Sequence, residues 1–568
     1  MASSIRLGQF LRRAAGSVSG IGVALGIIFF AASLTPTLIP RSYFMQGLLA
    51  GACLAIGYGI GVLWRWLWAY LELPEPQGRL RRSTNAVIVV CCAAIAVIFL
   101  MRATEWQNGI RSAMNMAPVD SAHPFKLSLL AFVTFVAMLA VGRLFAFLCR
   151  FAAAYLQSFI PTRVANLVGL VVVAALFWSI GNDLLIRSVF RVLDSSYREF
   201  DALIVPERAQ PTNPQKAGSA ASLVKWTELG RMGREFVDSG PTAGEIGAFT
   251  KRPAKEPIRV YVGLRGAYTP ETRARLALDE LKRVGGFDRS TLIIITPTGT
   301  GWVDPAAMDS VEYLHDGDIA SVAVQYSYLS SPLSLLAQPE YGSESAKALF
   351  REIYGYWTTL PKETRPKLFL HGLSLGALNS QKSAELFEML DDPIDGALWS
   401  GPPFASVMWR SITEMRNPGT PQWLPEFRDG RLFRFMNQNG SSVPAGTPWG
   451  GVRFLYLQYA SDPIVFFDYR DLFRQPAWME APRGPDVPAE LRWYPVVTML
   501  QLALDMGVAA GTPAGYGHVY APADYVDGWI QVSGLNGWTP ASIAALKSYL
   551  TQRLNTHLEN GSENNRGG

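Results

Sequence analysis

A serine flanked by two glycines is the residue of this sequence that is best placed to do chemistry. Ser374 is the centre of GLSLG (372–376), which follows the short apolar run Leu368–Leu370 and precedes a helix-compatible segment. This order predicts a nucleophile elbow, a strained strand-to-helix turn that exposes a serine hydroxyl while the glycines let strand and helix approach each other. The five-residue pattern alone is weak evidence, so the prediction that Ser374 is a nucleophile depends on the residues around it.

A serine hydroxyl becomes a good nucleophile only when a base takes its proton, and a carboxylate usually orients that base. In enzymes with a nucleophile elbow the chain order is serine, then acid, then histidine. Four of the five histidines do not fit, because they lie in a connection between apolar stretches, before the serine, three residues upstream on its own strand, or in the C-terminal tail: His123, His315, His371 and His557. His518, in the loop-like GYGH (515–518), is therefore the predicted base.

Asp462 is the predicted acid because it stands where a strand ends and a loop begins. It directly follows the apolar, aromatic run VRFLYLQYAS (452–461) and precedes a proline. Asp468 is the nearest competitor, but the intervening Ile464–Phe467 carries it away from the strand end. Asp505 lies in an expected helix and Asp524 follows the predicted base, so neither has the expected place.

An acyl-transfer site also needs two hydrogen-bond donors for the developing oxyanion. The backbone N–H of Leu375, directly after the nucleophile, is the first expected donor, and the loop after the third strand normally supplies the second. That loop is TPTGTGW (296–302), in which Thr298 and Gly299 are the candidate donors and an ordinary glycine-rich turn is the alternative. No HExxH, paired CxxC or GxxxxGK[ST] motif occurs, so neither a metal nor a nucleotide cofactor is predicted.

The segment 257–550 alternates strand-like and helix-like stretches, which predicts a C-terminal α/β domain with a mostly parallel, doubly wound sheet. Active residues in such a sheet gather at the carboxyl ends of the strands, where Ser374 is expected. The expected strands are Arg259–Leu264, Thr291–Thr296, Ile319–Tyr326, Lys367–Leu370, Ile394–Trp399 and Val452–Tyr459. The expected helices are Pro270–Val284, Pro305–His315, Ser343–Thr359 and Leu375–Leu390.

Three further segments complete the expected C-terminal organisation. Residues 191–256 are polar and rich in proline and glycine, which predicts a linker that wraps or spaces the catalytic domain, with a short helix at Leu223–Val237. The aromatic region 404–450 interrupts the alternation and is either a cap over the site or a surface insertion. Pro495–Met506 has the pattern of a helix, and 551–568 is a polar tail.

The N-terminal third has the composition of a membrane domain. The chain of 568 residues is 49% hydrophobic and only 17% charged, and the apolar excess lies before about residue 190. Five stretches approach the ~20 residues that cross the hydrocarbon core of a bilayer: Gly20–Leu38, Leu48–Leu63, Ala86–Met101, Leu127–Gly142 and Val164–Ile180. Residues 1–190 are therefore predicted to form a multi-pass domain of about five helices, with four or six as alternatives. A cleaved signal peptide would account for the first stretch only.

Basic residues indicate the orientation of this domain and exclude other partners. By the positive-inside rule they place the N-terminus and the second and fourth connections in the cytoplasm: Arg6, Arg12, Arg13, Arg65, Arg79, Arg81, Arg82, Arg143, Arg150 and Arg163. Five spans would then place the catalytic domain outside the cytoplasm. The net charge of +5 is modest and not gathered in runs, so a nucleic-acid partner is not expected. The four cysteines all lie in the apolar third, which excludes a disulfide framework in the catalytic domain.

With these residues in view, the sequence resembles a family of bacterial membrane-anchored α/β-hydrolase proteins that join a multi-pass N-terminal domain to a C-terminal hydrolase domain. The resemblance covers nearly the whole chain. It rests on SLTPTLIPRSYFMQG (from Ser33), EFVDSGPTAGEIGAF (from Glu235), AKEPIRVYVGL (from Ala254), TPTGTGWVDPAAMDSVEYLHDGDIASVAVQYSYL, HGLSLGA, DGALWSGPPF, YASDPIVFF and GHVYAPADYVDGW. One departure is Leu373, where the family is expected to carry Glu, and this bears on substrate preference.

The resemblance implies an α/β-hydrolase fold with Ser374 as nucleophile, Asp462 as acid and His518 as base, and it implies no particular substrate. Together with the residues, it predicts a membrane-anchored serine hydrolase of the esterase or lipase type, facing the extracytoplasmic side. Its expected partners are the lipid bilayer and an acyl-ester or lipid substrate. The alternatives are an acyltransferase that uses the same three residues, and a non-catalytic membrane scaffold on a hydrolase fold.

Overall fold

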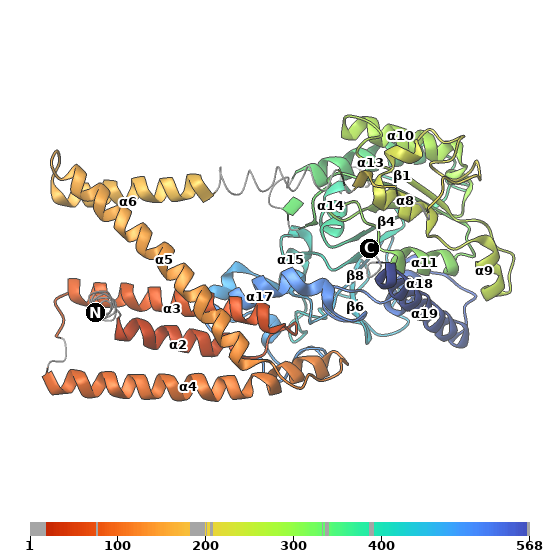
Figure 1. The fold of residues 1–568 in the computed structure, drawn as a ribbon. Coiled ribbons are helices and arrows are strands. Elements are labelled where there is room, and N and C mark those ends of the chain that lie inside the picture. Colours follow the sequence, from red (N-terminus) through yellow and green to blue (C-terminus); the bar gives the residue numbers. More distant parts are fainter. Residues whose placement is uncertain are drawn as a thin grey trace. The chain divides into compact units, whose positions relative to one another are not determined.

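Five helices in the N-terminal third of the chain coincide with the five apolar stretches of the sequence (Figure 1). They are α2 (Gly20–Leu34), α3 (Tyr43–Tyr70), α4 (Gly78–Ala113), α5 (Pro124–Leu156) and α6 (Thr162–Ser179). The computed structural model describes residues 19–74, 78–181, 199, 201–204, 208–331, 333–334, 340–384 and 391–564. Arg6, Arg12 and Arg13 lie outside the described residues, as do the side chains of Arg81, Arg82 and His557.

Four of these helices, α3 to α6, are long and apolar enough to cross a membrane. Helix α2 has only 15 residues, fewer than the ~20 of a typical span. It ends at Leu34 because Thr35 precedes a proline, and a residue in that position disfavours the helical conformation; Thr35 is extended, with φ −64° and ψ 159°. The expectation of about five spans is therefore reduced to four candidate spans in the part of the chain that the structure describes.

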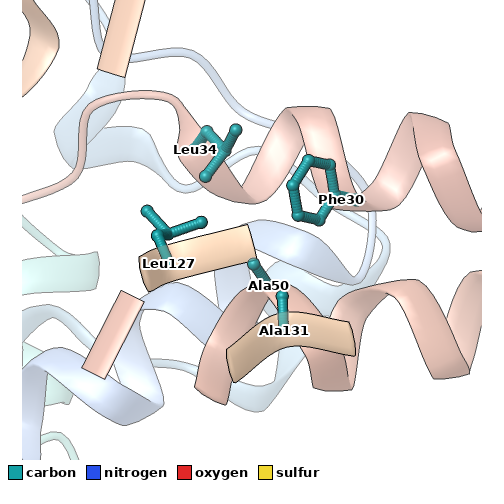
Figure 2. Packing of buried hydrophobic residues seen from close by; sticks show 5 residues of the cluster. All are labelled: Phe30, Leu34, Ala50, Leu127 and Ala131. Atoms are coloured by element: carbon teal, nitrogen blue, oxygen red, sulfur yellow. The ribbon is translucent and has the colours of Figure 1, made fainter. Parts of the chain in front are cut away.

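Small residues bring α2, α3 and α5 into close contact. Figure 2 shows Phe30 and Leu34 of α2, Ala50 of α3, and Leu127 and Ala131 of α5, which form one buried cluster. Next to this cluster a Cβ atom on Gly51 would lie 2.5 Å from the carbonyl oxygen of Ala131. Because helices in a membrane gain stability mainly from such close packing, this contact identifies α2, α3 and α5 as one folded group.

The chain divides into two units, and the division corrects one expected domain limit. The helical unit contains Met1–Leu184 and Phe467–Pro513, and the sheet unit contains Leu185–Phe466 and Ala514–Gly568. Residues 467–513, expected within the catalytic domain, thus belong with the membrane helices, because the apolar helix α17 (Val497–Val508) packs on them rather than on the sheet. The helix predicted at Pro495–Met506 is confirmed as α17.

The sheet unit contains one eight-stranded sheet, and its mostly parallel topology confirms the predicted fold class. The strands lie in the order β1-β3-β2-β4-β5-β8-β6-β7, and only β6 and β7 pair antiparallel. They are β1 (Ile258–Val262), β2 (Thr291–Thr296), β3 (Ile319–Val324), β4 (Lys367–Leu373), β5 (Gly396–Ser400), β6 (Phe433–Asn437), β7 (Gly440–Ser441) and β8 (Arg453–Leu457). All six predicted strands are present. Strands β1, β2, β3 and β5 are buried along their whole length, which explains their mostly apolar sequences. The exception in β1 is Arg259, whose buried guanidinium pairs with Asp309 and Glu312.

Helices cover both faces of this sheet (Figure 1). One group packs together as α10 (Pro270–Arg283), α13 (Tyr341–Trp357) and α14 (Leu375–Ser383). A second group contains α11 (Pro305–Leu314), α18 (Pro522–Ser533) and α19 (Pro540–Asn564). The remaining helices of the unit are α8 (Gly230–Asp238), α9 (Ala243–Thr250), α15 (Val407–Glu414) and α16 (Pro463–Phe466).

Three segments differ from the expected organisation. Region 404–450, expected as a cap or insertion, supplies β6 and β7 to the sheet, because Phe433 and Phe435 stack on Tyr456 of β8. In the described part of 191–256, the expected linker, α8 packs against β1. The expected tail continues α19 as far as Asn564, and residues 565–568 lie outside the described residues.

Candidate active site

Ser374 sits on a strained turn between β4 and α14. Its backbone has φ 57° and ψ −124°, a combination that costs a non-glycine residue energy and is kept where the surrounding structure enforces it. The flanking glycines are required by space. A Cβ atom on Gly372 would overlap the backbone of Gly376, and a Cβ atom on Gly376 would overlap the carbonyl oxygen of Thr296. The local geometry is that of a nucleophile elbow, and the Ser374 residue is almost fully buried.

Asp462 and His518 meet at hydrogen-bond distance. His518 Nδ1 lies 2.6 Å from Asp462 Oδ2, and the two side chains are 9% and 0% exposed. The same carboxylate oxygen accepts a hydrogen bond from the hydroxyl of Tyr520 at 2.8 Å, and Oδ1 accepts one from the N–H of Ile464 at 2.9 Å. A buried carboxylate with these donors is held in one orientation, so the ring of His518 is held too.

The loop 514–521 delivers His518, and the elements before it in the chain are helical rather than a strand. The loop is closed by its own backbone bonds, from Gly515 N–H to the Val519 carbonyl at 2.8 Å and from Val519 N–H to the Tyr516 carbonyl at 3.1 Å. Gly517 N–H donates to Ser461 Oγ at 2.9 Å. Because Ser461 directly precedes Asp462, this bond attaches the loop of the base to the strand end that carries the acid.

The ends of β4 and β8 bring Ser374 and Asp462 to the same edge of the sheet, and His518 reaches this edge from its loop. Strand β5 lies between β4 and β8, and the N–H of Ser374 donates to the carbonyl of Ser400 at the end of β5. The next residue, Gly401, has φ 50°, and a Cβ atom there would lie 2.6 Å from Cε1 of His518. His518 Nε2 is buried and has no hydrogen-bond partner among the residues that the structure describes. The ring thus keeps one nitrogen for Asp462 and leaves the other available.

The three candidate oxyanion donors differ in their surroundings. Leu375 is the first residue of α14, where a backbone N–H has no acceptor within its own helix. The N–H of Thr298 instead donates to the carbonyl of Trp302 at 2.9 Å, and that of Gly299 donates to Ser331 Oγ at 3.1 Å. In this conformation the N–H of Thr298 bonds within the loop and that of Gly299 bonds to Ser331, whereas the N–H of Leu375 has no acceptor within its own helix.

The rejected histidines have structural contacts. His371 Nδ1 lies 2.8 Å from the carbonyl oxygen of Leu398, and burial lowers the pKa of His371 to about 4. Burial likewise lowers the pKa of His315 to about 4, and its Nδ1 lies 3.2 Å from the hydroxyl of Thr291. The ring of His123 packs edge-on against Tyr43 in the helical unit.

The carboxylates that were rejected as the acid also have partners within the protein. Asp468 and Asp505 belong to the helical unit, where they bind Arg470 and Arg41. Asp524 accepts a hydrogen bond from the hydroxyl of Tyr459, and burial raises the pKa of Asp524 to about 6.

Sequence reasoning missed two residues beside the triad candidates, Tyr520 and Asp304. Tyr520 stands two residues after His518, a spacing that is not distinctive in the sequence. Asp304 Oδ2 accepts from the hydroxyl of Tyr525 at 2.9 Å, and Oδ1 accepts from the N–H of Ala306 at 2.9 Å. Burial raises the pKa of Asp304 to about 6, and a positive charge on nearby His518 would lower it. In the described parts of the chain, no group of three or more His, Cys, Asp and Glu side chains could hold a metal ion.

Comparisons with known proteins identify two family matches. The family model described as "Alpha/beta-hydrolase family" matches residues 258–546, and the model described as "Alpha/beta-hydrolase family N-terminus" matches residues 34–241. No curated protein and no solved structure matches the chain.

Proposed function

The chain belongs to the alpha/beta-hydrolase family, and from this premise we propose that it is a membrane-anchored serine hydrolase that cleaves carboxylic esters. Ser374 is the nucleophile, His518 the base and Asp462 the acid. The observation that carries this proposal is the 2.6 Å contact of His518 Nδ1 with Asp462, made while Nε2 of the same ring is buried without a partner in the described part of the chain.

In the proposed reaction, Ser374 Oγ attacks the ester carbonyl carbon while Nε2 of His518 takes the hydroxyl proton. The carbonyl oxygen gains the negative charge and is stabilised by the N–H of Leu375, with Thr298 and Gly299 as candidates for the second donor. When the tetrahedral intermediate collapses, His518 returns the proton to the leaving alcohol. Water then attacks the acyl-enzyme by the same steps and releases the acid, which restores Ser374. Asp462 stabilises the positively charged imidazole throughout.

Lipid or other acyl esters are the proposed substrate class. The support is that four helices of the chain are long and apolar enough to cross a membrane, which would keep the enzyme at a surface rich in acyl chains. The exposed apolar side chains of Val407 and Met415, on and directly after α15, are available to contact an acyl chain.

Acyl transfer to an alcohol is the second candidate. Ser374 is 7% exposed and the side chain of His518 is 9% exposed, so access of bulk water to an acyl-enzyme would be restricted. Restricted water favours an alcohol acceptor when one is bound.

The extracytoplasmic orientation remains part of the proposal, and contacts within the helical unit support it. Arg41, in the α2–α3 loop, donates its N–H to Gln107 near the end of α4, and the ring of Tyr43 at the start of α3 contacts His123 before α5. These contacts define one end of the helical unit, here called the loop end. Segment 467–513 reaches the same end, because Asp505 binds Arg41.

Five basic residues lie at the other end of the helices, whereas the loop end carries a mixed set of basic and acidic residues. These five lie late in α3 and α5 and at the start of α4 and α6: Arg65, Arg79, Arg143, Arg150 and Arg163. By the positive-inside rule that end is cytoplasmic, which makes the loop end extracytoplasmic. Helix α17 is too short to span a membrane. Segment 467–513 therefore begins and ends on the side of the membrane where the loop end lies. The same orientation follows whether or not α2 crosses the membrane completely.

Turnover of acyl esters tests the proposed activity. The purified full chain in lipid nanodiscs should hydrolyse p-nitrophenyl esters, with preference for long acyl chains, and Ser374→Ala should lower kcat by about 10³-fold or more. Ser411→Ala, at an exposed serine of α15, is the matched control and should retain the wild-type rate. Addition of an alcohol distinguishes the two reactions, because a transferase would convert ester to a new ester without loss of total ester. Equal rates for Ser374→Ala and wild type would refute the assignment.

A further inference from the structure

One N–H group of the candidate oxyanion loop is held by a serine from another loop of the sheet unit. The N–H of Gly299 donates to the side-chain hydroxyl of Ser331 at 3.1 Å. Gly299 follows β2, whereas Ser331 lies beyond the end of β3, and both residues belong to the sheet unit. A serine hydroxyl therefore occupies one of the two loop donors that are candidates for binding the oxyanion.

The oxyanion loop begins directly beside the nucleophile elbow. Strands β2 and β4 pair in parallel, with Thr296 opposite Gly372. A Cβ atom on Gly376 would lie 2.9 Å from the carbonyl oxygen of Pro297. Gly376 is the second residue of α14, so the loop starts against the helical turn whose first N–H belongs to Leu375. The loop is thus in place to supply a second donor next to this one.

The N–H of Thr298 is committed to a closed turn. It donates to the carbonyl of Trp302 at 2.9 Å, and the N–H of Gly301 donates back to the carbonyl of Thr298 at 2.9 Å. The carbonyl of Gly301 in turn accepts a hydrogen bond from the hydroxyl of Tyr261, on β1, at 2.8 Å. Release of the Thr298 N–H would therefore break backbone bonds and open a turn that the sheet holds in place.

The N–H of Gly299 differs from that of Thr298, because its acceptor is a side chain. A hydroxyl can turn away by rotation about one side-chain bond, and Ser331 is half-buried, so its displaced hydroxyl can bond to water. The close approach requires glycine, since a Cβ atom on Gly299 would lie 2.6 Å from the nitrogen of Ser331 and 2.7 Å from the carbonyl oxygen of Leu329. Of the two loop donors, Gly299 is the one that can be released without a change of the backbone.

We propose that Ser331 is a positioning residue of the oxyanion site, whose hydroxyl holds the N–H of Gly299 before the substrate reacts and gives way to the developing oxyanion. This inference rests on the proposed function. A neutral ester carbonyl forms a bond of similar strength to that of the hydroxyl, so it gains little from the exchange. The charged oxygen of the tetrahedral intermediate is a stronger acceptor and displaces the hydroxyl. The exchange therefore favours the transition state over the bound ester, which is the condition for catalysis.

Removal of the Ser331 hydroxyl should make the enzyme faster. In Ser331→Ala the free enzyme loses the bond to Gly299, whereas the transition state keeps its bond to the oxyanion. For the full chain in nanodiscs, the second-order rate constant for labelling of Ser374 by a fluorophosphonate should rise about 2- to 10-fold, the equivalent of one neutral hydrogen bond. The value of kcat/KM for p-nitrophenyl esters should rise by the same factor.

Three further variants control for the change of side chain. Ser331→Gly also lacks the hydroxyl and should show the same gain as Ser331→Ala. Ser331→Thr keeps a hydroxyl and should stay near the wild-type rate. Ser330→Ala is the matched control, because it removes the adjacent hydroxyl and leaves the bond between Ser331 and Gly299 in place.

A thiono ester separates the effect on the oxyanion from other causes. Sulfur is a weak hydrogen-bond acceptor, so the C=S group of this substrate gains little from the N–H of Gly299. The gain in kcat/KM of Ser331→Ala should therefore be present with the oxygen ester and absent with the matched thiono ester. A merely structural role of Ser331 would change the rates with both substrates alike.

Amide hydrogen exchange gives a readout that does not require activity. A peptide that covers 297–304 contains the amide of Gly299, so its exchange should be faster in Ser331→Ala and should match the wild type in Ser330→Ala.

The outcomes distinguish this inference from the proposed activity. If the wild type is labelled at Ser374 but folded Ser331→Ala is labelled no faster, Ser331 does not hold the oxyanion donor and the proposed activity stands. An equal gain with the thiono ester would overturn the inference in the same way. If the wild type is not labelled at all, the proposed activity fails and the inference fails with it.

Discussion

At the scale of single residues, the candidate site depends on backbone constraints as much as on reactive groups. Ser374 adopts φ 57° because glycines on both sides let β4 and α14 approach. Asp462, the candidate acid, could be singled out from the sequence because it stands directly after an apolar strand. Tyr520 could not, because a tyrosine near a histidine has no distinctive pattern until the loop brings its hydroxyl to Asp462.

Gly401 provides a direct test of the position of His518. Gly401→Ala should lower kcat for ester hydrolysis by about 100-fold, because a Cβ atom 2.6 Å from His518 Cε1 must displace the ring. The φ of 50° adds strain for any residue with a side chain. Gly355→Ala is the control, since a Cβ atom there meets nothing within 4 Å, and it should leave kcat unchanged. If Gly401→Ala retained the wild-type kcat, His518 would not act as the base from the position that it has in this structure.

At the scale of elements, the uniformly apolar runs of the sheet could be predicted because buried parallel strands need apolar residues on both faces. Strand β6 was not predicted. Its sequence FRFMN (433–437) contains an arginine and lies within an aromatic segment that has no clear strand or helix periodicity. The first apolar stretch was predicted to run to Leu38, because Leu34 and Leu38 extend it beyond the point where Thr35 and Pro36 end helix α2. The apolar residues of this stretch indicate that it is buried, whereas Pro36 determines where the helix ends.

Segment 467–513 shows what the order of elements along the sequence cannot predict. The helix at 497–508 could be predicted from its pattern, but its partner could not, because an apolar face does not identify what covers it. The partner follows from the buried charges: Arg41 and Asp505 are 464 residues apart in sequence and satisfy each other. Taken alone in the sequence, Arg41 resembles any loop arginine and Asp505 resembles any helix aspartate.

At the scale of the whole molecule, the chain contains a helical unit with four candidate spans and a sheet unit that holds the three triad candidates. Membership of the alpha/beta-hydrolase family agrees with the sheet topology. The side of the membrane on which the sheet unit works determines which esters it can meet.

Cysteine accessibility tests the proposed orientation. In a background with Cys53, Cys91, Cys92 and Cys149 replaced by Ala, a membrane-impermeant maleimide on intact cells should label Gln552→Cys, on the exposed side of α19. It should not label Glu72→Cys, in the exposed α3–α4 connection, until the cells are permeabilised. The reverse pattern would place the sheet unit in the cytoplasm and contradict the proposal.

We propose that His518 and Asp462 activate Ser374, and the site and rate of fluorophosphonate labelling in the full-length protein test this activation. We expect a single adduct on the peptide that contains Ser374, no labelling of Ser374→Ala, and labelling slower by about 10³- to 10⁴-fold in Asp462→Asn and His518→Ala. Ser411→Ala should label like the wild type. An adduct on another serine, or a rate in His518→Ala equal to the wild-type rate, would contradict the claim and favour a non-catalytic role for the fold.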